Sequence, residues 1–131
     1  GAARAIAAAL CEAGVGWLTI ANRNLKKAQD LVNLLSTKGG FNNISARALL
    51  TIDGAGVDMI INSTSLGLSA EDPLPLILNN VSKDTVIADI IMVPNETKWL
   101  QSASRRGLQV HYGRHMLDYQ IELIGRYIGA L

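Results

Sequence analysis

The stretch Gly16-Trp-Leu-Thr-Ile-Ala-Asn-Arg-Asn-Leu-Lys-Lys-Ala28 joins a short apolar run to a polar turn and then to a helix. The run 16–21 is rich in residues that favour strands, so it predicts a buried β-strand. Asn24 can cap the helix, because its side-chain oxygen can accept a backbone N–H of the first turn. The apolar face of this helix is formed by Leu25, Ala28, Val32 and Leu35, and the pair Gly39-Gly40 is expected to end it.

The same alternation of strands and helices continues on both sides of this stretch. Continuous apolar strands between helices are typical of a parallel sheet that is covered on both faces. The sequence therefore predicts an α/β fold with a doubly wound parallel sheet. The further predicted strands are 44–49, 58–62, 85–89 and 108–112, and the further predicted helices are 2–13 (ended by Gly14), 97–106 and 115–127.

The first predicted element is a helix, whereas a nucleotide-binding βαβ unit begins with a strand. In the usual strand order that first strand lies in the centre of the sheet, with neighbours on both sides. We therefore expect a Rossmann-like sheet that lacks its first strand, and a chain that is a fragment of a longer protein.

Composition narrows the class of protein. The chain has 131 residues, of which 49% are hydrophobic, which fits one domain with a real core. Lys and Arg number 12 against 11 Asp and Glu, so a nucleic-acid partner is not expected. No apolar run is long enough to span a membrane, and we expect a cytoplasmic protein. Cys11 is expected to pack in an apolar helix, and with His111 and His115 it offers no metal-ligand spacing.

Basic and amide side chains follow the predicted strand 16–21. Dinucleotide-binding folds select their cofactor at this place, where an acidic residue favours NAD. Here the place is taken by Asn22, Arg23 and Asn24, with Lys26 and Lys27 behind them. A guanidinium, an ammonium and a helix N-terminus together favour the 2′-phosphate of NADP. The alternative is a solvated basic helix start in which Lys26 pairs with Asp30.

Two further groups of polar residues are candidates for ligand contact. The turn Asn62-Ser-Thr-Ser-Leu-Gly67 follows a buried strand, and ligands of open parallel sheets bind outside the carboxyl ends of strands. Ser and Thr are also common in ordinary turns, so a purely structural turn is the alternative. Gln120 borders the buried side of the last predicted helix, where its amide needs either a ligand or a backbone carbonyl as its partner.

Five motifs, in this order, resemble the C-terminal NADP-binding domain of the shikimate and quinate dehydrogenase family. The resemblance covers essentially the whole chain. It implies hydride transfer between NADP and the C3 position of shikimate or a close relative. It also implies a separate N-terminal substrate domain that carries the acid/base residues, and a homodimer could form through that domain. The motifs are Gly1-Ala-Ala-Arg-Ala5, Asn22-Arg23-Asn24 with Lys27, Asn62 to Gly67, Asp89 to Pro94 with Thr97 and Leu100, and Gly113-Arg-His-Met-Leu-Asp-Tyr-Gln120.

The resemblance also implies a role for individual residues. No catalytic acid or base is assigned in this chain, and Lys83, Asp84 and Lys98 are not proposed as substitutes. Gln120, and Met92 at the place of a tyrosine in the family, would lie beside the substrate. The residues implied to contact NADP are Gly1 and Ala2 at the pyrophosphate, Asn22, Arg23, Asn24 and Lys27 at the adenosine phosphate, and Thr64, Ile90 and Gly113 near the cofactor, the last two close to the nicotinamide.

Two positions depart from the family pattern. Met92 cannot donate the hydrogen bond of the tyrosine it replaces, and His115 stands where the family has a glycine. A site that loses a hydroxyl contact loses selectivity. These departures indicate a divergent member, with quinate or another polyol acid as a candidate substrate. The alternatives for these residues are simple packing for Met92 and a surface position for His115.

Other functions remain open from the sequence alone. The chain could be the NADP domain of a protein like glutamyl-tRNA reductase, although the motif 113–120 speaks against this. It could be a module that binds NADP without chemistry, or, with an incomplete phosphate loop, it could bind nothing as an isolated chain.

Overall fold

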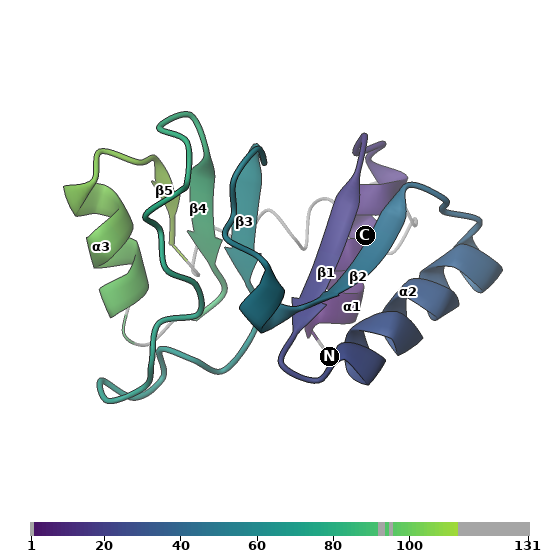
Figure 1. Ribbon diagram of the computed structural model, residues 1–131, viewed down its shortest axis with the longest axis horizontal. Coiled ribbons are helices and arrows are strands. Elements are labelled where there is room, and N and C mark those ends of the chain that lie inside the picture. Colours follow the sequence, from purple (N-terminus) through teal and green to yellow (C-terminus); the bar gives the residue numbers. More distant parts are fainter. Residues whose placement is uncertain (1, 92–93, 95, 113–131) are drawn as a thin grey trace, which may run out of the picture. The chain divides into compact units, whose positions relative to one another are not determined.

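The computed structural model describes residues 2–91, 94 and 96–112. These residues form two compact units, one that ends at Ile52 and one that begins at Asp53. Each unit contains parallel strands, and Figure 1 labels the elements in chain order. The predicted helix 115–127 lies outside the described residues.

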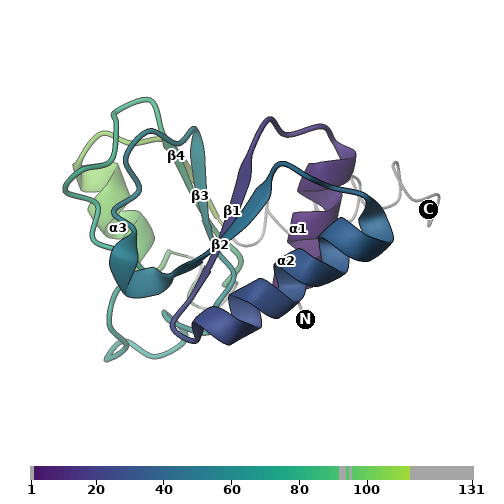
Figure 2. The ribbon, with the colours of Figure 1, turned by 45° about the vertical axis from the view of Figure 1, so that its right-hand side comes forward.

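The first unit is a two-stranded parallel sheet with two helices. Strands β1 (Leu18–Asn22) and β2 (Ile44–Ala48) pair from Leu18 opposite Ile44 to Asn22 opposite Ala48. Helices α1 (Ala2–Glu12) and α2 (Leu25–Gly39) lie on one side of these strands (Figure 2). Ala7, Leu35 and Ile44 form the centre of this core, and the partly buried Cys11 packs against it as expected.

Both predicted ends of α2 are confirmed. The side chain of Asn24, which has an extended backbone, accepts a hydrogen bond from the Lys26 N–H at 3.0 Å. Gly40 has a φ of 71°, a left-handed conformation that glycine adopts without steric cost. Its N–H donates to the carbonyl of Leu35, which closes the C-terminal end of the helix. A short 3₁₀-helix (Leu49–Thr51), which the sequence did not predict, follows β2.

The second unit is a three-stranded parallel sheet with one helix. Its strand order is β3 (Met59–Asn62), β4 (Val86–Asp89) and β5 (Val110–His111), and α3 (Lys98–Arg105) connects β4 to β5. Because the strands are parallel, the residues that follow β3 and β4 leave the sheet at the same edge.

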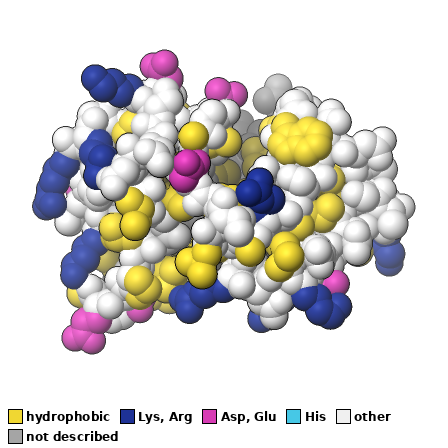
Figure 3. All heavy atoms as spheres, viewed as in Figure 1, with side chains coloured by type: hydrophobic (Ala, Val, Ile, Leu, Met, Phe, Trp, Pro, Cys, Tyr) yellow, Lys and Arg dark blue, Asp and Glu magenta, His cyan; other side chains and the backbone are white. Residues whose placement is uncertain are grey.

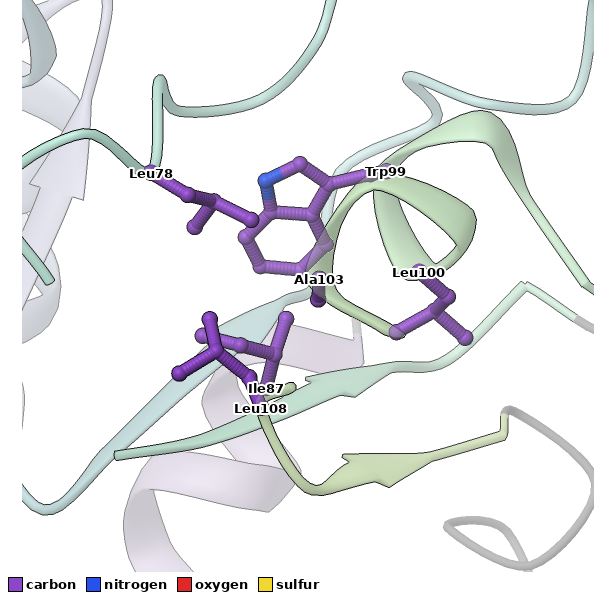
Figure 4. Close-up of a cluster of buried hydrophobic side chains, with 6 residues drawn as sticks. All are labelled: Leu78, Ile87, Trp99, Leu100, Ala103 and Leu108. Atoms are coloured by element: carbon purple, nitrogen blue, oxygen red, sulfur yellow. The ribbon is translucent and has the colours of Figure 1, made fainter. Parts of the chain in front are cut away.

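Helix α3 packs on the sheet of this unit through a cluster of buried side chains (Figure 4). Trp99 is 2% exposed, and its indole N–H donates to the carbonyl of Leu76 at 2.8 Å, so its polar group is satisfied. This cluster fixes the start of α3 against β4. Its members are Leu78, Ile87, Trp99, Leu100, Ala103 and Leu108.

The predicted α/β class with parallel strands is confirmed, although individual strands differ from their expected bounds by one or two residues. The strand expected over 16–21 begins at Leu18 and extends to Asn22. Within the described residues, none of the helices is long and apolar enough to cross a membrane. On the face drawn in Figure 3, Lys and Arg side chains lie at several separate places and not in one stripe.

Candidate functional site

The turn between β1 and α2 is stiffened by its two asparagines. The side-chain oxygen of Asn22 accepts the N–H of Asn24 at 2.8 Å. The side-chain oxygen of Asn24 in turn accepts the N–H of Lys26 at 3.0 Å. Arg23 lies between these two side-chain caps, and its own side chain is exposed. The turn therefore holds the backbone of Arg23 at the N-terminus of α2 while its guanidinium stays accessible.

Among the described residues, carboxylates neutralise only part of the positive charge at this turn. Lys26 pairs with Asp30 at 3.4 Å, as the structural alternative predicted. Both partners are largely exposed, so the pair contributes little to stability. Among the described residues no ion pair includes Arg23 or Lys27. Together with the dipole of the 15-residue helix α2, these two side chains make the turn attractive to an anion.

The structure adds Arg47, which the sequence analysis did not single out. Arg47 lies opposite Ala21 in the parallel register, one position before the ends of both strands. Its side chain is exposed, and its guanidinium donates to the carbonyl of Thr51 at 3.2 Å. Only the register of β1 and β2 places Arg47 at the carboxyl edge of this sheet, and no sequence motif indicates it.

The turn after β3 is organised by Asn62, which is 3% exposed. Its side-chain oxygen accepts both the N–H of Thr64, at 3.0 Å, and the hydroxyl of Thr64, at 2.6 Å. Its amide nitrogen donates to the carbonyl of Leu66 at 3.0 Å. The Thr64 hydroxyl also accepts the N–H of Leu66. Thr64 itself is exposed, and hydrogen bonds to the buried Asn62 side chain set its position at the surface.

Asp89, the last residue of β4, is fully buried beside this turn. One carboxylate oxygen accepts the Asn62 amide at 3.2 Å and the N–H of Ile91 at 3.0 Å. The other accepts the hydroxyl of Thr97 at 3.0 Å. Thr97 is the N-cap of α3 and receives the N–H of Leu100. Thus Asp89 connects the ends of β3 and β4 to the start of α3.

The loop that continues from this turn is held from two sides. Asp72 accepts the N–H groups of Gly67 and Ser69 at 3.0 and 3.1 Å, and these bonds lower the pKa of its carboxyl group. Lys98, the first residue of α3, donates to the carbonyl of Ala70. The loop is therefore tied both to itself and to the helix.

Gly67 packs closely against the same region. Its φ is 118°, and a Cβ placed there would lie 2.9 Å from Ile91 Cδ1. Such a distance forces a shift of the neighbour, and L side chains rarely adopt this backbone conformation. A glycine at this position lets the turn after β3 lie directly on the segment after β4.

The remaining predicted contacts are divided between described and undescribed parts of the chain. Ala2 is exposed at the start of α1. Ile90 is half-buried, and its N–H donates to the carbonyl of Asn62 at 3.2 Å. Within the described part, no cluster of His, Cys, Asp and Glu could hold a metal ion. Gly1, Met92, Gly113, His115 and Gln120 lie outside the described residues.

Shikimate dehydrogenases are among the known proteins that are similar to this chain. The NADP(+)-dependent shikimate dehydrogenase of Rhodopseudomonas palustris strain TIE-1 is 35% identical over 123 residues, which cover 92% of this chain and 42% of the relative. That of Methanococcus maripaludis strain C6 is 38% identical over 122 residues, with shares of 92% and 43%. The chain is similar in sequence to the shikimate dehydrogenases. It spans less than half the length of these relatives. No protein-family model matches the sequence.

Solved structures of dehydrogenases and reductases are similar to the chain. The quinate dehydrogenase of Corynebacterium glutamicum, in complex with NAD, has a TM-score of 0.83 at 25% identity, over 98% of this chain and 47% of that one. The 5-ketofructose reductase of Gluconobacter sp. strain CHM43 has a TM-score of 0.77 at 32% identity, with shares of 98% and 48%. Shikimate 5-dehydrogenase of Thermus thermophilus, in complex with NADP(H) and shikimate, has a TM-score of 0.64 at 27% identity, with shares of 92% and 42%.

Proposed function

We propose that this chain is the NADP-binding part of a dehydrogenase that acts on shikimate or a similar polyol acid. The observation that carries the proposal is the homology to shikimate dehydrogenases across 92% of the chain. The polar turns that follow β1 and β3 support it, because ligands of open parallel sheets bind at such ends.

The turn after β1 is proposed to hold the adenosine end of NADP. Arg23 and Lys27 would contact the 2′-phosphate, and the N-terminus of α2 would add its dipole. Asn22 and Asn24 would contribute mainly by fixing the turn, since both side-chain oxygens already accept backbone N–H groups. The absence of an acidic residue at positions 22 to 24 favours NADP over NAD.

The turns after β3 and β4 are proposed to lie near the nicotinamide. Thr64 is exposed and held by Asn62, and the half-buried Ile90 donates its N–H to the carbonyl of the same Asn62. Gly113 is the third proposed contact, and Gln120 and Met92 are proposed to face the substrate. NADP would accept or supply the hydride. The residues of this chain would bind and orient it and would keep water from the transfer path.

The proposed substrate is a polyol acid. Among the similar proteins are enzymes named for shikimate, quinate and 5-ketofructose. Met92 in place of the family's tyrosine favours a substrate other than shikimate itself, and quinate is the first candidate. The acid and base of the reaction are proposed to come from outside these 131 residues.

Turnover by the full-length product of the gene that encodes this chain tests the proposal. Reduction of the nicotinamide is followed by absorbance with shikimate or quinate, each with NADP or NAD. NADP-dependent reduction with either acid supports the proposal. Tight NADP binding without turnover of either acid would support a binding module without chemistry, or a different substrate. The absence of both NADP binding and turnover would refute the proposal.

A further inference from the structure

Asp89 is the most completely buried carboxylate among the described residues, and its bonds join three separate segments. It is 0% exposed, and it accepts hydrogen bonds from a side-chain amide, a backbone N–H and a hydroxyl. None of these donors is charged, and no ion pair of the described residues includes Asp89. A buried carboxylate without a cation is costly unless all its acceptor sites are used.

Two of the three donors, Asn62 and Ile91, belong to the segments that carry the proposed nicotinamide contacts, and the third, Thr97, is the N-cap of α3. Asn62 holds Thr64 through two bonds to its side-chain oxygen, and its carbonyl receives the N–H of Ile90. The same Asn62 amide is shared between Asp89 and the carbonyl of Leu66. Loss of the Asp89 carboxylate would therefore remove one bond of the Asn62 amide and the bond of the Ile91 N–H, and so loosen the two turns that carry Thr64 and Ile90.

We propose that Asp89 is a positioning residue for the nicotinamide end of the cofactor site. Its carboxylate locks the turn after β3, the turn after β4 and the N-cap of α3 into one arrangement, so that Thr64 and Ile90 present a fixed surface. The inference rests on the proposed NADP site, but it concerns a residue to which neither the motif nor the homology assigns a role. Because Asp89 is 0% exposed, it would act through these neighbours and not by contact with the cofactor or substrate.

Two ligands separate this role from general stability. 2′,5′-ADP carries only the adenosine end of NADP, whereas NADPH carries the nicotinamide as well. In the full-length protein, Asp89→Ala should weaken NADPH binding about tenfold, the equivalent of about 1.4 kcal/mol. It should change 2′,5′-ADP binding by less than about twofold, because that ligand needs only the turn after β1.

The conservative variant supplies the matched control. Asp89→Asn keeps an oxygen for Asn62 and Ile91, and its amide can donate to the Thr97 hydroxyl oxygen. It should bind NADPH within about threefold of the unchanged protein. The change in nicotinamide fluorescence on binding should be reduced in Asp89→Ala and restored in Asp89→Asn. If Asp89→Ala fails to fold, Thr97→Val removes the hydroxyl donor to Asp89 and Thr97→Ser keeps it. Thr97→Val should then weaken NADPH binding more than 2′,5′-ADP binding, and Thr97→Ser should restore NADPH binding.

The outcomes are distinct. Weaker NADPH binding with unchanged 2′,5′-ADP binding, rescued in Asp89→Asn, supports the positioning role. Equal losses for both ligands in a folded variant would overturn it and leave Asp89 a purely structural residue. Unchanged NADPH binding in Asp89→Ala would also overturn it. If the unchanged protein binds neither ligand, the proposed function itself fails.

Discussion

Replacement of Arg23 by alanine should lower the affinity for NADP about tenfold and that for NAD by less than about twofold. The Arg23 side chain is exposed, and no ion pair within the described residues ties it to a carboxylate. Its guanidinium is therefore available for a ligand without first breaking a bond. A hydrogen bond to a charged group contributes about 1.5–3 kcal/mol, and exposure to solvent places this contact at the lower end. The loss is not complete, because Lys27 and the N-terminus of α2 remain.

Titration calorimetry of the full-length protein with NADP and NAD measures both affinities. Lys83→Ala is the matched control, because it removes one exposed positive charge from a loop of the other unit. It should leave both affinities unchanged. The NADP affinity of the unchanged protein should also fall with rising salt more steeply than that of Arg23→Ala. Equal losses of NADP and NAD affinity in Arg23→Ala would refute the assignment of the 2′-phosphate to this turn.

Three further predictions follow from particular contacts. Asn24→Asp keeps a side-chain oxygen for the helix cap, so the melting temperature should stay unchanged. The added negative charge should lower the affinity for NADP relative to that for NAD. A large drop in melting temperature would contradict the capping role. Leu100→Ala should lower the free energy of unfolding in urea by about 2–5 kcal/mol, because Leu100 is 0% exposed. Leu50→Ala is the control, and it should lower this free energy by less than about 0.5 kcal/mol because Leu50 is 96% exposed. Similar values for the two variants would disprove the role of Leu100 in packing. Hydrogen bonds from the Gly67 and Ser69 amides lower the pKa of Asp72. The stabilising effect of these bonds should therefore be complete above the usual aspartate pKa and should disappear as the pH falls through the lowered pKa. The Gly67 amide resonance in NMR reports this titration, and a midpoint at or above pH about 3.9 would contradict the prediction.

Local sequence signals predict the α-helices and strands of the described residues, although not the 3₁₀-helix Leu49–Thr51. Asn24 and Thr97 each cap a helix where a polar residue precedes an apolar periodicity, and Gly40 ends a helix in the left-handed conformation. The strands are apolar runs between such signals. Their observed ends differ from the expected ones by one or two residues, because the pairing partner and not the residue itself decides where a strand stops.

The geometry of the site depended on information that a single sequence does not carry. Asn62 and Asp89 were both recognised as members of motifs, but their hydrogen bond joins residues 27 positions apart. It exists because the parallel register sets Asn62 opposite Asp89 at the ends of β3 and β4. Arg47 reached the edge of the other sheet through its register with Ala21 in the same way. Neither register can be predicted from a local sequence pattern, because long connections join parallel strands.

The most direct test of the proposed cofactor site is a crystal structure of the full-length protein with NADP. The 2′-phosphate should lie within hydrogen-bond distance of the Arg23 guanidinium, at the N-terminus of α2, and the nicotinamide should lie beside Thr64 and Ile90. A 2′-phosphate bound elsewhere, with Arg23 directed into solvent, would contradict the account.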